Sequence, residues 1–165
     1  MKSKSGLWGF LFVGVLGTLF HFVYDFLGQN WVAGIFFPLN ESIWEHLKLL
    51  FLPVVLWWFA EWFWGKRQPC FFPIRMRALV YALGAIPVLY YTYSGIIGRR
   101  FSAVDIGIFF VADALYFWLV HRFSRDKTEE SEGETLWYLL IFLVLVFSFA
   151  VFTFFPPDLA FFREP

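Results

Sequence analysis

The segment Thr135–Phe155, TLWYLLIFLVLVFSFAVFTFF, decides the fold class of this chain. It has no charged side chain, and its apolar residues follow one another without the strict alternation of a half-buried strand. An α-helix needs about 20 mostly apolar residues to cross the hydrocarbon core of a bilayer. The segment therefore predicts a membrane-spanning helix.

The rest of the chain repeats this pattern. Backbone groups in lipid must form hydrogen bonds within their own segment, so helices are expected for runs of this length. We expect an all-α, polytopic transmembrane bundle with five spans, forming a single domain over residues 1–165. The four further spans are Gly6–Gly28, Ser42–Trp64, Ile74–Ile97 and Ala103–Phe123.

The composition excludes several classes of protein. Of 165 residues, 60% are hydrophobic, 25% aromatic and only 16% charged. A soluble domain of this size could not remove so much apolar surface from water. The net charge is zero without a basic patch, so we expect membrane lipid rather than nucleic acid as a partner. Cys70 is the only cysteine, which excludes an internal disulfide and a metal site built from cysteines of one chain.

The distribution of basic residues predicts the orientation. Cytoplasmic ends of spans carry an excess of Lys and Arg. With five spans, the N-terminus is therefore predicted inside and the C-terminus outside, in the cell membrane. The predicted inner side carries Lys2, Lys4, Lys66, Arg67, Arg75, Arg77, Arg122, Arg125 and Lys127, against Lys48, Arg99, Arg100 and Arg163 on the outer side.

Polar residues from several spans fall at the predicted outer end of the bundle. Such residues are costly in a membrane and usually face the protein interior or a wet cavity. His21 and Asp25 are four residues apart and share a helix face with Gly14 and Gly17, small residues that let helices approach closely. The candidate ligand-binding residues are His21, Asp25, Asn40, Glu41, Glu45, His46, Lys48, Ser94 and Asp113.

Structural roles compete with functional ones at these positions. Ser42 and Glu45 fit a capping box, and Lys48 is placed to neutralise Glu45. A hydrogen bond between His21 and Asp25 within one helix would satisfy both groups. His121 lies beside Arg122 in the sequence, and we expect its polar atoms to point to the membrane surface. We expect the same of Glu61, which lies close to Lys66 and Arg67.

The run Pro38–Lys48, PLNESIWEHLK, is the densest polar motif in the chain. It resembles a segment of an uncharacterised family of small bacterial integral membrane proteins, a domain of unknown function. The resemblance extends to His21 and Asp25, to Tyr93-Ser94-Gly95 and to Pro156-Pro157, and so covers most of the chain. It implies a membrane protein but no activity, cofactor or mechanism.

Three classes of function remain open from the sequence, and whether the protein is an enzyme is undecided. In the first, the polar cluster binds or passes a cation or a small polar solute, since carboxylates and imidazoles are common in such pathways. In the second, a divalent metal on His21, Asp25, Glu45 and His46 supports hydrolysis of a lipid-like substrate, with Glu41 or Glu45 as catalytic base. In the third, the protein is a structural or assembly subunit of a membrane complex, or forms a homo-oligomer.

Overall fold

The computed structural model describes residues 3–64, 70–126 and 132–164, and within them five long helices carry the fold. They are long and apolar enough to cross a membrane, which confirms the predicted multi-span bundle. The basic residues Lys2, Lys66, Arg67 and Lys127, on which the predicted orientation partly depends, lie outside the described residues. The helices are α1 (Ser3–Phe26), the short α2 (Trp31–Phe36), α3 (Ile43–Phe63), α4 (Phe71–Ile97), α5 (Ser102–Asp126) and α6 (Glu132–Phe154).

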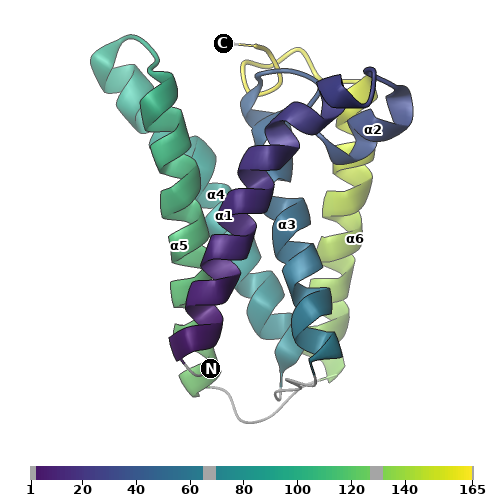
Figure 1. Ribbon diagram of the computed structural model, residues 1–165, viewed down its shortest axis with the longest axis vertical. Helices are drawn as coiled ribbons and strands as arrows, with labels where there is room; N and C mark the ends of the chain where they lie inside the picture. The colour runs from purple at the N-terminus through teal and green to yellow at the C-terminus, as the bar shows by residue number, and fades with distance from the viewer. Residues whose placement is uncertain (1–2, 65–69, 127–131, 165) are drawn as a thin grey trace.

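The long helices run alternately up and down, so the two termini lie at opposite ends of the bundle (Figure 1). We call the end that carries α2 and residues 155–164 the mouth end. The loop between α1 and α3 contains α2, which starts at an Asn30 cap. The segment after α6 folds back over the start of α3, where the Trp44 amide donates to the Phe161 carbonyl at 3.2 Å.

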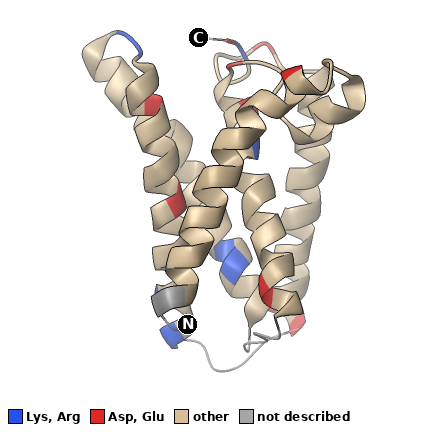
Figure 2. Cartoon of the chain, viewed as in Figure 1, with Lys and Arg blue, Asp and Glu red and all other residues tan. Residues whose placement is uncertain are grey.

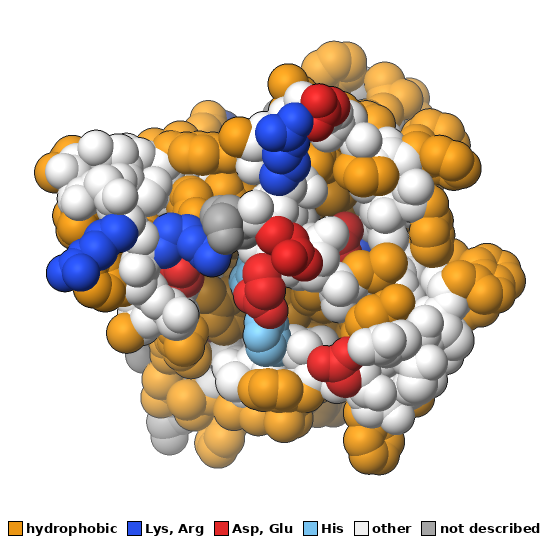
Figure 3. All heavy atoms as spheres, turned by 90° about the horizontal axis from the view of Figure 1, so that it is seen from above, with side chains coloured by type: hydrophobic (Ala, Val, Ile, Leu, Met, Phe, Trp, Pro, Cys, Tyr) orange, Lys and Arg blue, Asp and Glu red, His pale blue; other side chains and the backbone are white. Residues whose placement is uncertain are grey.

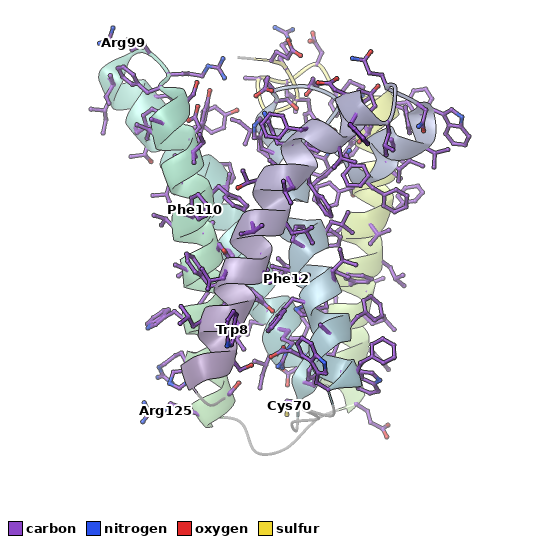
Figure 4. The ribbon with its side chains drawn as sticks, in the orientation of Figure 1. Trp8, Phe12, Cys70, Arg99, Phe110 and Arg125 are labelled. Carbon is purple, nitrogen blue, oxygen red and sulfur yellow. The ribbon has the colours of Figure 1, made fainter. Side chains whose placement is uncertain are left out.

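Helix α3 is the centre of the bundle. In the most apolar stretch of α3, 72% of the residues are buried inside the protein. The corresponding share in α6 is 6%, so α6 lies at the outside of the bundle. Large apolar side chains such as Trp8 and Phe147 are 66% and 69% exposed, and a bilayer is the solvent that suits them. Figure 4 shows Arg99 at the turn between α4 and α5, and Arg125 at the opposite end of α5. Charged side chains therefore lie at both ends of the apolar part of α5.

Glycines of α1 set how closely this helix approaches its neighbours. A Cβ atom on Gly17 would lie 2.6 Å from the Leu49 carbonyl oxygen of α3 and 2.6 Å from the Phe109 ring of α5. A Cβ on Gly14 would lie 3.0 Å from the Phe110 ring. The predicted small-residue face of α1 is thus in contact with both helices, and it places His21, one turn beyond Gly17, beside the start of α3.

Candidate metal centre

Three side chains from separate parts of the chain meet at the mouth end. His21 projects from α1, Glu41 from the loop before α3, and His46 from the first turns of α3. One ligand atom from each residue lies within 4.8 Å of the other two. The Nε2 atom of His21 is 3.4 Å from Oε1 of Glu41, and Nε2 of His46 is 3.4 Å from Oε2 of the same carboxylate. We call these three residues the His–Glu centre.

The backbone fixes the orientation of His46. Its Nδ1 lies 2.9 Å from the carbonyl oxygen of Ser42, which can only accept a hydrogen bond, so Nδ1 carries the proton. In the neutral imidazole, which is the form that binds a metal, the lone pair of Nε2 then faces the centre. A histidine that ligates a metal usually donates its other ring N–H in this way, which fixes both tautomer and ring angle.

The start of α3 brings Glu41 and His46 together. Ser42 is the N-cap, and its hydroxyl accepts the amide of Glu45 at 3.3 Å. Asn40 holds the preceding turn, where its side-chain oxygen accepts the Ser42 amide at 3.0 Å. The cap half of the predicted capping box is therefore present. Its reciprocal half is not, because Glu45 Oε2 accepts the amide of Leu39 at 2.9 Å.

The centre is partly open. The side chains of His21 and His46 are 33% and 30% exposed, and that of Glu41 is 59% exposed. Looking onto the mouth end, Figure 3 shows imidazole beside carboxylate groups near the middle of this face. Three protein ligands with room for a fourth, external ligand are typical of catalytic or exchangeable zinc sites, whereas structural sites are closed by four.

A cavity of about 640 Å³ adjoins the centre. It lies between α1, α3, α4 and α5, and all three residues of the His–Glu centre line it. Polar groups from the α4–α5 hairpin, Arg100, Ser102 and Asp105, line it as well. The remaining walls are mainly apolar. The centre therefore borders a space large enough for a small molecule.

Glu45 and Lys48, both predicted at the site, form a second and separate cluster. They are 2% exposed and joined by a 2.8 Å salt bridge. The ammonium of Lys48 also donates to the Gly34 carbonyl at 2.8 Å and to the Thr153 hydroxyl at 2.5 Å. These bonds tie α3 to α2 and α6. The pair is enclosed and satisfied by protein groups, so the predicted neutralisation of Glu45 is observed.

The other predicted residues are dispersed. Asp25 is exposed, and its Oδ1 accepts the Gln29 side-chain amide at 2.9 Å instead of bonding His21. Glu41 thus takes the place beside the imidazoles that the sequence assigned to Asp25 and Glu45. Ser94 lies near the end of α4, outside the residues that line the cavity. Asp113 lies near the middle of α5, is 0% exposed, and has no hydrogen-bond partner within the described residues.

The carboxylate of Glu61 does not reach the membrane surface, which corrects the expectation from the sequence. Lys66 and Arg67, its expected neighbours, lie outside the described residues. Glu61 is 2% exposed, and its Oε2 accepts a hydrogen bond from Arg75 at 2.8 Å. Beside this pair the Trp58 indole donates to the Tyr116 hydroxyl at 2.6 Å. Consecutive antiparallel helices bring residues at similar distances from their turn together, and that rule would have pointed from Glu61 to Arg75.

No curated protein and no solved structure matches the chain. One family does, over residues 2–165, and its description reads "Family of unknown function (DUF6512)". This confirms the resemblance to an uncharacterised family that the sequence motifs carry. Because the match spans nearly the whole length, the chain belongs to the family of unknown function DUF6512.

Proposed function

We propose that this multi-pass membrane protein binds a divalent transition-metal ion, with Zn²⁺ as the best match, at the His–Glu centre. One observation carries the proposal: donor atoms of His21, Glu41 and His46 lie within 4.8 Å of one another. Ligand atoms bound at ~2.0–2.2 Å around one tetrahedral zinc ion lie about 3.3–3.6 Å from one another, so the 3.4 Å separations of the imidazole nitrogens from the Glu41 carboxylate already suit such a site. The hydrogen bond from His46 to Ser42 supports it by leaving Nε2 free.

The chemistry of the donors favours zinc over the common hard cations. Ca²⁺ and Mg²⁺ prefer shells of oxygen ligands, whereas imidazole nitrogen suits Zn²⁺, Cu²⁺ and Ni²⁺. Two imidazoles and one carboxylate are also the set that holds zinc in many hydrolases. Following the Lys/Arg bias, we further propose that the centre faces the outside of the cell membrane.

The chain offers a matched test of metal binding, because it contains three histidines and only two belong to the centre. His121 is exposed on α5 near its far end. We expect His46→Ala and His21→Ala to weaken Zn²⁺ binding at least about 100-fold in calorimetric titration, since each loses one of three ligands. His121→Ala should bind like the wild type. Equal Zn²⁺ affinity in all three variants, or none in the wild type, would refute the proposal.

A second candidate function is metal-assisted hydrolysis of a lipid-like substrate. The cavity beside the centre favours it, because a substrate there would lie within reach of a metal-bound water. Glu41 is committed to the centre and Glu45 to Lys48, so neither keeps the simple role of free base that the sequence suggested. Zinc-dependent ester hydrolysis that His46→Ala abolishes and His121→Ala retains would support it. Hydrolysis unaffected by His46→Ala would exclude it.

A further inference from the structure

The cavity beside the His–Glu centre changes character with depth. Along α5 its lining passes from Ser102 and Asp105 to Ile106, Ile108 and Phe110. Eight residues separate Ser102 from Phe110, which corresponds to about 12 Å along a helix. One end of the cavity is therefore polar and the other apolar.

The apolar end excludes most hydrophilic ligands. Across from α5 it is lined by Leu49 of α3, by Ile86 of α4 and by Gly17 of α1. The hydroxyl of Thr18, which also lines this part, already donates to the Gly14 carbonyl at 2.8 Å. A polar solute filling this space would leave its own hydrogen-bonding groups unpaired, at a cost of several kcal/mol. A hydrocarbon chain has no such groups and gains from leaving water. The volume of about 640 Å³ is in the range of small-molecule sites and too small for a protein partner.

The polar end favours an anion once a metal is bound. Its ionisable side chains are Glu41, His21 and His46 of the centre, together with Arg100 and Asp105. Asp105 already accepts a hydrogen bond from the Tyr93 hydroxyl of α4. A divalent ion would outweigh the charge of Glu41, and Arg100 would add a donor that suits carboxylate or phosphate oxygens.

We propose that the cavity binds a single-chain amphiphile with an anionic oxygen head group, such as a fatty acid or a lysophosphatidate. The head group lies at the metal and Arg100, and the acyl chain extends between α1 and α5 towards Phe110. This proposal rests on the proposed function, because without the metal the polar end carries two carboxylates against one guanidinium. Amphiphile binding is therefore metal-dependent.

The test uses Co²⁺ in place of Zn²⁺, because the visible absorption of Co²⁺ responds to a change of ligand and not to lipid partitioning. The full-length protein is placed in phosphatidylcholine nanodiscs and titrated first with Co²⁺ and then with palmitate or a lysophosphatidate. We expect a saturable spectral change with at least one of these amphiphiles. Acetate at the same concentration should give little change, since it has no chain to bury.

Two matched pairs of variants separate the head from the chain. Ile106→Trp adds an indole to the cavity, whereas Val111→Trp adds one at a similarly exposed position of α5 that does not line it, the two residues being 59% and 55% exposed. We expect Ile106→Trp to weaken the amphiphile response at least about tenfold while Co²⁺ binding and the Val111→Trp response stay unchanged. Arg100→Gln should weaken it about tenfold, and Arg99→Gln, which lies outside the cavity lining, should not.

The outcomes separate the two proposals. If the wild type binds Co²⁺ but neither amphiphile alters its spectrum, the cavity proposal is wrong and the metal centre survives. The same holds if Ile106→Trp responds like Val111→Trp. If Co²⁺ itself does not bind, the metal centre fails first, and the metal-dependent amphiphile site fails with it.

Discussion

At the scale of single residues, the bundle buries ionisable side chains in two different surroundings. Lys48 and Glu45 are enclosed together and surrounded by hydrogen-bonding partners from α2 and α6. Asp113 is as deeply buried, yet neither of its oxygens has a partner among the described residues. A buried polar group stabilises a fold only when it is paired. The two sites should therefore respond to substitution in opposite directions.

Removing Lys48 should be strongly destabilising. Lys48→Met leaves the Glu45 carboxylate buried without its cation, and breaking a buried pair in this way costs about 3–5 kcal/mol. We expect the double variant Glu45→Gln/Lys48→Met to recover much of that loss, because no charge is then left uncompensated. Denaturant unfolding in detergent measures both. A double variant no more stable than the single one would contradict this account.

Removing Asp113 should stabilise the protein. Asp113→Leu keeps the number and branching of the side-chain heavy atoms and eliminates an unsatisfied polar group, whose burial costs about 1–3 kcal/mol. We expect the free energy of unfolding to rise by an amount in that range. Asp25→Leu is the control, because Asp25 is exposed and its loss should have little effect. A less stable Asp113→Leu protein would contradict this account.

At the scale of helices, the approach of α1 to α3 and α5 determines where His21 lies. Gly17→Ala would place a methyl group 2.6 Å from the Leu49 carbonyl oxygen, so α1 must move. We expect both lower thermal stability and weaker Zn²⁺ binding in this variant. Gly107→Ala is the matched control, since a Cβ there meets nothing within 4 Å, and it should be neutral or stabilise by about 0.5–1 kcal/mol. Unchanged Zn²⁺ affinity in Gly17→Ala would show that the position of His21 does not depend on the close packing at Gly17.

The sequence predicts the helices well and their rotations poorly. Continuous apolar runs such as Thr135–Phe155 are a strong signal, because a helix satisfies the backbone groups of such a segment within the segment itself. The small face of α1 is also predictable from Gly14 and Gly17. The partner of His21 is not, because Glu41 comes from a loop whose path depends on the caps at Asn40 and Ser42. Four-residue spacing favoured Asp25, which instead bonds Gln29 beyond the end of α1.

At the scale of the whole molecule, the location of the centre and the orientation of the chain are linked. The His–Glu centre and the C-terminal segment share the mouth end, opposite the N-terminus. Any bias that keeps the N-terminus inside therefore exposes the centre to the outside. Figure 2 shows ribbon segments coloured for Lys or Arg within the lower part of the bundle as well as near its base. The buried Arg75, which α4 carries, is neutralised by Glu61. A paired residue of this kind contributes less to the inner positive charge than an unpaired one would.

This link gives a prediction about access to the metal from the two sides of a membrane. In right-side-out vesicles from expressing cells, a membrane-impermeant chelator added outside should remove Co²⁺ from the centre, because Glu41 is 59% exposed at the mouth. In inside-out vesicles the same chelator should leave the Co²⁺ spectrum unchanged, since α1 packs closely against α3 and α5 at Gly9 and Gly17 on the N-terminal side of the centre. His46→Ala vesicles, which should bind little Co²⁺, provide the background.

Removal of Co²⁺ only from inside-out vesicles would show that the predicted orientation is wrong, although the metal centre would remain supported. Equal removal from both kinds of vesicle would mean that the chelator reaches the centre from each side of the membrane.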